Sequence, residues 1–458
     1  MLFVKRIFKQ NKMSSITKNS VITFSSQILI FALGFVASII LARVLGPEGK
    51  GIFALIVLIP ALMLKLGSLG IEAANVYFTG SKRYGIKDIA SNSLLGSSLL
   101  GSILILLFFG VFHLDIFQNY LASNQINSFY LWLVVLTVPL SLLSGFLISI
   151  FLGAEKITVY NKINIFNSTF HLILVTVFLV ILKKGVFGAV ISYVLGIIGC
   201  ALVAILFITK FTKINFSFNR KLLKDSTKYG LKAYFGNLTQ FLNYRLDMLL
   251  VAAFLTPVSV GFYSIAVGIA ERLWMLPGAI ATVLFPKISS IKDTEANSLT
   301  PRIVRHTFLI IFIFSLILAL IAKPLIKILF GSVFLPSVMP LIILLPGIIA
   351  LGGCKILTAD LAGRGKPQFG TYAAFVSLAV NIPLNLWLIP KWGISGAAFA
   401  SSVAYITSTL IVMVAFVKIS NTSWVTILFI KNEDFKDYKN LLAKLRKKWN
   451  QMSGHFFA

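Results

Sequence analysis

Charged residues are scarce in this sequence, and acidic residues are the scarcest of all. Only 12% of the 458 residues are charged, and 42 Lys and Arg stand against 14 Asp and Glu. A water-facing surface needs roughly 25–35% charged residues, whereas this chain has a mean hydropathy of +0.92. The composition therefore excludes a soluble globular domain and indicates a lipid bilayer as the surrounding solvent.

Cysteine, histidine and nucleotide-binding motifs are also nearly missing. The two cysteines, Cys200 and Cys354, lie in apolar runs, which predicts buried, inert thiols. The four histidines are scattered, and no Cys or His pair has the spacing of a metal site. The sequence has no Walker motif, G-x-G-x-x-G or G-x-S-x-G. We therefore expect no metal, no cofactor and no ATP hydrolysis on this chain, and no loop is long enough for a catalytic domain.

Long apolar runs fill the rest of the chain. A spanning helix needs roughly 20 mostly apolar residues, and we predict an all-α polytopic membrane protein with about twelve such helices. The predicted spans are Ser20–Arg43, Gly51–Tyr77, Ile89–Leu114, Ser128–Gly153, Tyr160–Leu182, Val186–Ile208, Tyr229–Leu255, Val258–Phe285, Val304–Phe330, Val338–Leu361, Gly370–Ile389 and Ile394–Val417.

The positive charge predicts the orientation of these spans. A net charge of +28 in a soluble protein would indicate nucleic acid, but here the cations lie between and beyond apolar runs. With the N-terminus inside, 30 of the 42 Lys and Arg fall on the inner side, as the positive-inside rule requires. Both termini are thus predicted to be cytoplasmic. Residues 2–9 and 435–449 alternate apolar and basic residues and are predicted to lie on anionic lipid.

An internal repeat divides the spans into two sets of six. Leu45-Gly46-Pro47 with Gly51 recurs as Leu255-Thr256-Pro257 with Gly261, at an offset of 210 residues. Residues 153–156 (GAEK) recur at 363–366 (GRGK), also at 210, and residues 184–189 (KGVFGA) recur at 392–397 (WGISGA), at 208. An even number of spans per half makes the halves parallel. We predict two parallel six-helix bundles around a central cavity, with rocking between them giving alternating access.

The predicted domain organisation follows from the repeat. Residues 1–209 form the N-terminal bundle with its basic arm, and residues 210–228 form a cytoplasmic linker. Residues 229–419 form the C-terminal bundle, and residues 420–458 form a basic amphipathic cytoplasmic tail. Prolines inside four spans are candidate kinks: Pro60, Pro139, Pro277 and Pro346.

Ionisable residues inside the spans are the candidate site. Each such group costs roughly 2.5–3.5 kcal/mol on insertion scales, so it needs a cavity or a partner. The candidate cations for a diphosphate are Arg245, Arg272, Lys65 and Lys355, because Arg and Lys bind phosphate oxygens. The candidate carboxylates for ion coupling or for pairing are Glu72, Asp247, Glu271 and Asp360.

Spacing along the helices separates these candidates further. Lys65 and Glu72 are seven residues apart, so we expect them on one face of one helix. Arg245 and Asp247 are two apart and point to different faces, so we expect Arg245 in the cavity and Asp247 in a structural pair. Lys232 lies near the inner end of its span, where it can reach the membrane interface. A salt-bridge network between helices, without any ligand, is the alternative reading of the whole set.

Two segments resemble a known family. Residues 41–55 (LARVLGPEGKGIFAL) are similar to the first-hairpin signature of bacterial polysaccharide flippases, and residues 243–250 (NYRLDMLL) are similar to their seventh helix. That family belongs to the multidrug/oligosaccharidyl-lipid/polysaccharide superfamily. The lipid II flippases are similar too, but they commonly carry two further helices.

The resemblance implies a function in the bacterial inner membrane. It implies translocation of undecaprenyl-diphosphate-linked oligosaccharide repeat units from the inner to the outer leaflet, for O-antigen, capsule or exopolysaccharide. It implies a cationic cavity for the headgroup, made here by Arg245 with Lys65, Arg272 and Lys355. A proton or sodium gradient would act through the four carboxylates. A polysaccharide polymerase and a chain-length regulator are the protein partners that it allows.

Three other functions stay open. A drug or cation antiporter of the same superfamily would have a cavity biased to acidic and aromatic groups, whereas cations exceed acids in these spans. A sugar facilitator of another twelve-helix fold is favoured only by the loop at residues 79–85. A non-transporting scaffold of a polysaccharide assembly complex would tolerate neutral residues in place of the intramembrane charges.

Overall fold

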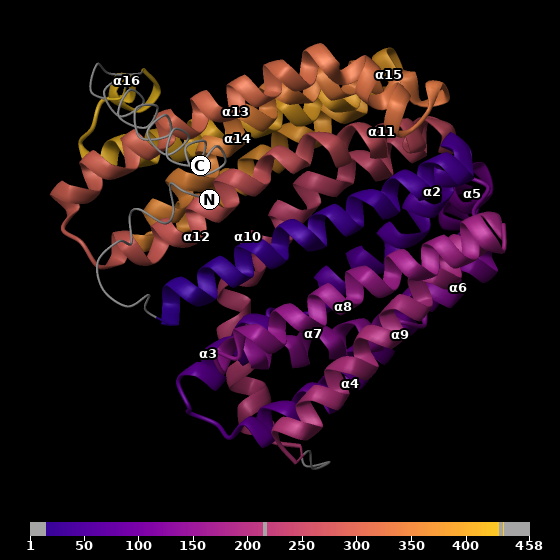
Figure 1. The fold of residues 1–458 in the computed structure, drawn as a ribbon, viewed down its shortest axis with the longest axis horizontal. Coiled ribbons are helices and arrows are strands. Elements are labelled where there is room, and N and C mark those ends of the chain that lie inside the picture. Colours follow the sequence, from indigo (N-terminus) through magenta and orange to yellow (C-terminus); the bar gives the residue numbers. More distant parts are fainter. Residues whose placement is uncertain (1–14, 214–217, 430–433, 435–458) are drawn as a thin grey trace, which may run out of the picture. The chain divides into compact units, whose positions relative to one another are not determined.

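The computed structural model describes residues 15–213, 218–429 and 434, and all regular elements in these ranges are helices (Figure 1). The predicted surface helices at residues 2–9 and 435–449 lie outside the described residues. The helices are α2 (Ser15–Gly67), α3 (Ile71–Gly80), α4 (Ile86–Phe112), α5 (Asp115–Ser123), α6 (Ser128–Val135), α7 (Val138–Gly153), α8 (Ile157–Val175), η1 (Thr176–Ile181), α9 (Gly185–Phe211), α10 (Arg220–Phe254), α11 (Pro257–Ala270), η2 (Glu271–Trp274), α12 (Met275–Ser289), α13 (Asp293–Leu329), η3 (Ser332–Ser337), α14 (Val338–Gly363), α15 (Gln368–Ser420) and α16 (Trp424–Leu428).

Nine helical stretches within the described residues are long and apolar enough to cross a membrane, which confirms a multi-pass helical membrane protein. Two of them hold more than one span. Helices α2 and α15 have 53 residues each, or about 80 Å at 1.5 Å per residue, against roughly 30 Å of hydrocarbon. Each is interrupted by a glycine with positive φ, Gly46 in α2 and Gly393 in α15. The total of twelve spans stays a prediction.

The predicted second span is not one continuous helix. Helix α2 ends at Gly67 and α3 begins at Ile71. Between them Leu69 and Gly70 have φ of 46° and 72°, values that a right-handed helix cannot contain. The expectation that Lys65 and Glu72 share one face of one helix is therefore wrong, because the break rotates α3 relative to α2.

Two of the four prolines coincide with breaks in their spans. Pro139 follows the break between α6 and α7, and the 3₁₀ turn η2 lies directly before Pro277. A proline has no N–H to donate to the carbonyl four residues earlier, and its ring pushes that carbonyl away. For Pro277 that carbonyl belongs to Leu273, inside η2. Helices α2 and α14 continue across Pro60 and Pro346.

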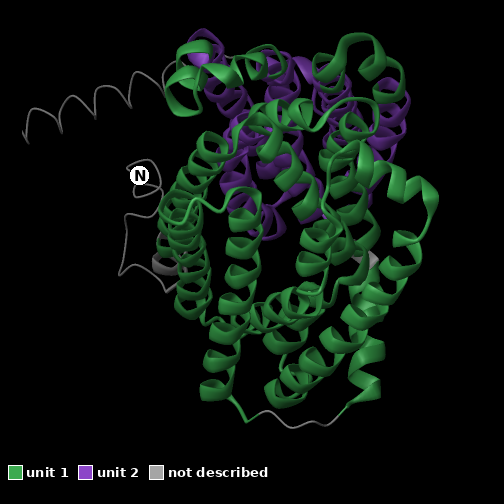
Figure 2. Cartoon of the chain, turned by 90° about the vertical axis from the view of Figure 1, so that its right-hand side faces the viewer, with its two compact units in different colours: residues 1–266, 323–340, 385–397 green, residues 267–322, 341–384, 398–458 purple. Residues whose placement is uncertain are grey.

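The chain forms two compact units, coloured separately in Figure 2. Unit 1 comprises residues 1–266, 323–340 and 385–397, and unit 2 comprises residues 267–322, 341–384 and 398–458. In unit 1, α2 packs against α8 and α9, and α7 packs against α3, α4 and α9. Their shared core contains large buried side chains from these helices, among them Phe78, Ile89, Leu147, Phe151 and Ile163.

Helix α10 also belongs to unit 1 and packs against α3 and α4. Asn92 and the backbone of Asn219 exchange two hydrogen bonds of 2.8 Å. Gly70 and Gly230 meet backbone to backbone, since a Cβ added to Gly230 would lie 2.4 Å from the carbonyl oxygen of Leu69. Residues 220–228, predicted as part of a linker, are thus the first turns of a helix that is fixed to the first half of the chain.

The sequence repeat reappears as matching turns. After α7 the amide of Lys156 donates to the carbonyl of Phe151 at 2.9 Å, and after α14 the amide of Lys366 donates to that of Leu361 at 2.8 Å. The residues before these amides, Glu155 and Gly365, both have positive φ, 56° and 75°. The third pair matches as well, because Gly185 and Gly393 have φ of 55° and 59°.

The first repeat pair forms a reciprocal contact within unit 1. A Cβ added to Gly51 would lie 1.8 Å from the carbonyl oxygen of Pro257, and a Cβ added to Gly261 would lie 2.0 Å from that of Pro47. Residues 47 and 51 are the repeat partners of residues 257 and 261. Each Leu-x-Pro turn therefore presents its carbonyl to the glycine of the other, a local pseudo-twofold arrangement that only glycine allows at both places.

Candidate transport site

Two of the predicted residues lie close together on α10, in unit 1. Arg245 is half-buried, and its guanidinium donates to the backbone carbonyl of Tyr244 at 3.2 Å. Asp247 is only 2% exposed and accepts a hydrogen bond from the hydroxyl of Tyr263 on α11, which is completely buried. A carboxylate held by a buried tyrosine helps to fix α10 against α11. The structural role predicted for Asp247 and the ligand role predicted for Arg245 stay predictions.

Lys65 and Glu72 are the other two candidates in unit 1, and both are exposed. Lys65 is in the last turn of α2, and Glu72 is in the first turn of α3. The carboxylate of Glu72 lies along α7 at Gly145, where an added Cβ would come within 2.6 Å of its Oε1. The lack of a side chain at Gly145 thus leaves the space that the Glu72 carboxylate occupies.

Three further candidates come together in unit 2. Glu271 and Arg272 are in the 3₁₀ turn η2, and Lys355 is on α14. The Lys355 ammonium lies over the ring of Trp274, 5.0 Å from its centroid, and Trp274 contacts Tyr405 edge to face. Glu271 is within electrostatic range of both cations. Two cations and one carboxylate therefore lie beside an aromatic wall in unit 2.

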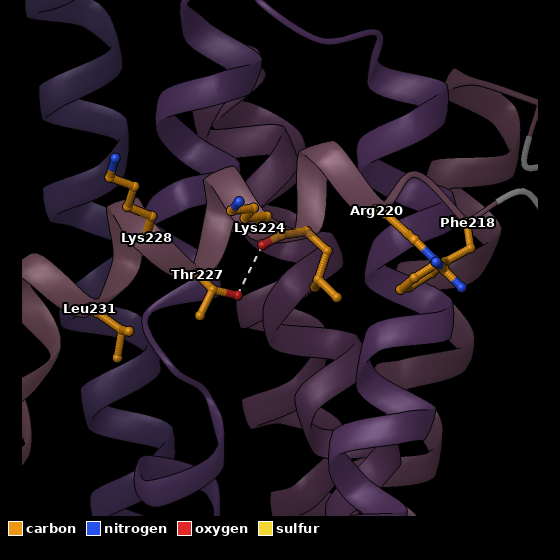
Figure 3. Close-up of a pocket in the computed structure, with 7 residues that line it drawn as sticks. Phe218, Arg220, Lys224, Thr227, Lys228 and Leu231 are labelled. Atoms are coloured by element: carbon orange, nitrogen blue, oxygen red, sulfur yellow. Dashed lines mark hydrogen bonds between the residues drawn. The ribbon is translucent and has the colours of Figure 1, made fainter.

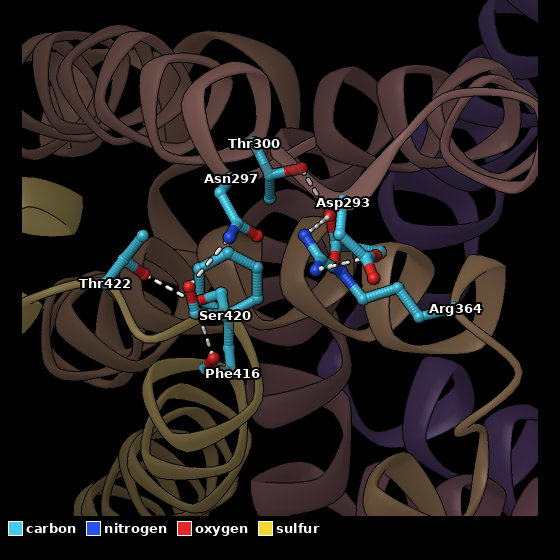
Figure 4. Close-up of polar contacts among 8 residues, drawn as sticks. Asp293, Asn297, Thr300, Arg364, Phe416, Ser420 and Thr422 are labelled. Carbon is cyan, nitrogen blue, oxygen red and sulfur yellow. Dashed lines mark hydrogen bonds and ion pairs between the residues drawn. The ribbon is translucent and has the colours of Figure 1, made fainter. Parts of the chain in front are cut away.

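Asp360 lies in a separate network of unit 2, shown in Figure 4. It is fully buried, pairs with Arg364 (Nε–Oδ1 2.5 Å) and accepts a hydrogen bond from Thr300. Arg364 also reaches Asp293 at 3.3 Å and stacks on Phe416, 5.6 Å from the ring centroid. The network joins α13, α14 and α15, so of the two roles predicted for Asp360 its geometry fits pairing.

Two buried arginines, Arg364 and Arg305, were not among the residues predicted for the site. Arg364 is four residues after Asp360, and this spacing on a helix is itself a signal for an ion pair. Arg305 on α13 is 4% exposed and forms a two-pronged pair with Asp434, at 2.6 and 2.9 Å. Its partner is 129 residues away, and no local pattern predicts that pairing.

The two cysteines, Cys200 and Cys354, are buried free thiols, as predicted from the apolar runs around them. Within the described ranges, no group of three His, Cys, Asp or Glu side chains could hold a metal ion. The side chain of Lys232 is outside the described residues.

The four candidate cations thus divide evenly between the units. Lys65 and Arg245 are in unit 1, whereas Arg272 and Lys355 are in unit 2. Within unit 2, Arg272 and Lys355 share Glu271 as a neighbour. The assembly of all four around one diphosphate stays a prediction.

Comparisons with known proteins agree on family and fold. A "Putative O-antigen transporter" of Shigella flexneri is 25% identical over 426 residues, which cover 87% of this chain and 96% of that protein. The "Probable low-salt glycan biosynthesis flippase Agl15" of Haloferax volcanii is 27% identical over 204 residues, covering 42% of this chain and only 41% of that relative's own length.

Solved structures show the same fold at low sequence identity. The lipid II flippase MurJ in an inward closed conformation has a TM-score of 0.72 at 20% identity, covering 93% of this chain and 96% of that one. An inward-facing multidrug resistance MATE family transporter of the MOP superfamily has a TM-score of 0.66 at 15% identity, covering 85% and 94%.

The family described as "Polysaccharide biosynthesis protein" matches residues 16–292, more than half of the chain, and includes both segments that carried the resemblance. This chain is therefore a multi-pass helical membrane protein that belongs to the polysaccharide biosynthesis protein family.

Proposed function

We propose that this chain is a flippase that moves undecaprenyl-diphosphate-linked oligosaccharide repeat units from the inner to the outer leaflet of the bacterial cytoplasmic membrane. The product would serve O-antigen, capsule or exopolysaccharide synthesis. Family membership and the similarity to the Shigella protein over 96% of its length support a role in handling such lipids. The named glycan flippase of Haloferax supports it over part of the chain.

The observation that carries the proposal is the cationic cluster of unit 2. Arg272 and Lys355 share one nearby carboxylate, Glu271, and Lys355 is stacked on Trp274. Each charge within the hydrocarbon costs roughly 2.5–3.5 kcal/mol on insertion scales, so cations that are kept there are candidates for binding an anionic ligand. A diphosphate is such an anion, because guanidinium donors bind two of its oxygens at once and an ammonium acts as a point charge.

The passenger would cross by alternating access between two bundles. The cations would hold the diphosphate, and the polyprenyl tail would stay in lipid. The direction of transport would require an energy source, and Glu271, which is within electrostatic range of both cations, would be the carboxylate that exchanges a proton or sodium ion. Both termini would face the cytoplasm, and a polysaccharide polymerase would receive the product on the outer side.

The test is complementation in a strain that lacks the gene. The deletion should accumulate lipid-linked oligosaccharide on the cytoplasmic leaflet, measured by accessibility of the glycan to an enzyme added from one side. The parent gene should clear the accumulation. Arg245→Ala and Lys355→Ala should clear it at least tenfold more slowly at equal membrane abundance, whereas Arg245→Lys should restore part of the rate.

A matched control removes a cation that is predicted to lie outside the membrane. Lys183→Ala should behave like the parent. Full clearance by both alanine variants would contradict the headgroup assignment and favour the scaffold function. Normal leaflet distribution in the deletion strain, together with new sensitivity to cationic drugs, would favour an antiporter instead.

A further inference from the structure

The first turns of α10 precede the span predicted at Tyr229–Leu255, so we expect them at the level of the lipid headgroups. The helix has 35 residues, about 52 Å in length, so it extends well beyond roughly 30 Å of hydrocarbon. Tyrosines gather where it leaves the apolar region: Tyr229 stacks on Tyr77 at 4.4 Å, and Tyr234 donates to the carbonyl of Leu66. Tyrosine is typical of the membrane interface.

A groove of about 660 Å³ follows the outer face of these turns (Figure 3). Arg220, Lys224 and Lys228 line it at intervals of four residues, so their side chains emerge from one helix face, about 6 Å apart per turn. All three are exposed. The rest of the lining is Phe218, Leu223, Thr227 and Leu231.

The polar groups of the groove select for an anion. The hydroxyl of Thr227 donates to the carbonyl of Leu223 at 2.9 Å, so its proton is already used. The nearest carboxylate on the helix, Asp225, accepts hydrogen bonds from Arg83 at 3.0 Å and from the hydroxyl of Tyr84 at 2.7 Å. The groove therefore offers cationic donors on an apolar floor, and its described lining contains no carboxylate or amide.

The same composition argues against a sugar as the ligand. An oligosaccharide needs side-chain acceptors as well as donors for its hydroxyls, and the described lining offers cationic donors but no carboxylate or amide acceptor. A phospholipid needs only cations for its phosphate and apolar side chains for its acyl chains. Each Lys or Arg near a membrane surface attracts an anionic lipid by about 1 kcal/mol, so three on one face form an effective site.

We propose that this groove binds an anionic glycerophospholipid of the leaflet that we predict to be the inner one. Its phosphate contacts Arg220, Lys224 and Lys228, and its acyl chains lie along Leu223 and Leu231. The lipid is a resident partner of the protein and is distinct from any transported molecule. This inference does not depend on the proposed transport function.

The test measures lipids that stay bound to the purified full-length protein. Native mass spectrometry would count phosphatidylglycerol and phosphatidylcholine of identical acyl chains across a titration. The variant R220Q/K224Q/K228Q should bind phosphatidylglycerol roughly 100-fold more weakly, at about fivefold per cation, with weak phosphatidylcholine binding unchanged. The conservative variant K224R/K228R should keep parental affinity.

A second triple variant controls for net charge. K82Q/K87Q/K221Q also removes three exposed cations from the same region, without touching the groove. It should bind phosphatidylglycerol within about twofold of the parent. Equal losses in both triple variants, or parental affinity in the groove variant, would overturn the proposal.

A competition experiment separates a resident lipid from the proposed passenger. Undecaprenyl diphosphate, added to the protein loaded with phosphatidylglycerol, should displace it no better than further phosphatidylglycerol does. Displacement at a tenfold lower concentration would overturn the assignment to a phospholipid and make the groove a receptor for the passenger. Loss of transport in Arg245→Ala, with lipid binding intact, would show that the two sites are separate.

Discussion

The reciprocal contact between the two Leu-x-Pro turns makes a sharp prediction about glycine. A Cβ at Gly51 would lie 1.8 Å from the carbonyl oxygen of Pro257 and 2.9 Å from the amide nitrogen of Gly261. Carbon atoms normally approach other heavy atoms no closer than about 3.5 Å. Both neighbours are backbone atoms, which cannot rotate away, so the two segments would have to separate by more than about 1.5 Å.

The expected penalty can be estimated from two opposing effects. Overpacking of this kind typically costs about 1–3 kcal/mol. Alanine in a helix is favoured over glycine by about 1 kcal/mol, which offsets part of the clash. We expect Gly51→Ala and Gly261→Ala each to lower stability by about 1–2 kcal/mol. The double variant should lose less than the sum, because the first substitution already separates the shared interface.

The controls are glycines with open space around them. Gly96 and Gly110 on α4 have no heavy atom within 4 Å of an added Cβ. Gly96→Ala and Gly110→Ala should therefore leave stability unchanged or raise it by up to about 1 kcal/mol. The same glycine-to-alanine substitution is thus predicted to lower stability at Gly51 and Gly261 but not at Gly96 and Gly110.

Thermal unfolding in detergent, followed by tryptophan fluorescence, would measure the difference. A shift of roughly 2 °C per kcal/mol is expected for a chain of this size or somewhat smaller. The unfolding temperature of Gly51→Ala and Gly261→Ala should fall, and that of the α4 variants should not. If all four variants unfold at or above the parental temperature, the backbone contact that links the two turns is refuted.

Three further predictions concern the turns and the ion pairs. Glu155 has φ of 56°, and its repeat partner is Gly365. Glu155→Gly should therefore stabilise the protein by roughly 0.5–1 kcal/mol, and Gly365→Ala should destabilise it by about 1 kcal/mol. The two variants should shift the unfolding temperature in opposite directions, and shifts of the same sign would contradict the prediction. Asp360→Asn removes the buried charge partner of Arg364 and leaves it only the exposed Asp293, so a loss of roughly 3 kcal/mol and reduced membrane abundance are expected. A parental unfolding temperature would refute the pairing. The hydrogen bond from a tyrosine hydroxyl, aided by an adjacent arginine, lowers the pKa of Asp225 below its ordinary value of 3.8; its stabilising contribution is then fully present above pH 4 and lost as the pH falls through the lowered value. The difference in unfolding temperature between the parent and Asp225→Asn should stay constant from pH 7 to about pH 5 and shrink below about pH 4. A difference that grows with acidity would contradict a lowered pKa of Asp225.

Features that depend on local backbone chemistry could be predicted from the sequence. The break before Pro277 follows from the missing N–H of this proline. The matching turns at residues 155 and 365 follow from the sequence repeat at an offset of 210 residues. The break between α2 and α3 was missed although Gly67 and Gly70 stand close together there. Glycine pairs are common in membrane helices, so their spacing alone does not separate a break from a close helix contact.

Features that depend on distant partners could not be predicted. Arg305 stands at the start of a predicted span and Asp434 lies in a polar segment far along the chain, and neither alone indicates its partner. Only the packed structure buries them together, at 4% and 1% side-chain exposure. The same limit applies to the candidate site, because composition finds the charges within the spans but not which of them share a neighbour, as Arg272 and Lys355 do.

The glycines of the repeat and the charges within the spans obey different constraints. Gly51 and Gly261 are both glycine because each meets a backbone carbonyl that cannot move. Side chains that face a ligand have no such constraint and can differ between the halves. At the offset of 210 residues, Lys355 corresponds to Gly145. In unit 2 the lysine lies over Trp274, whereas in unit 1 the glycine leaves space for the carboxylate of Glu72. Equivalent places of one scaffold therefore hold a cation in one half and a carboxylate in the other, which is the asymmetry that a single anionic passenger and a separate coupling ion would require.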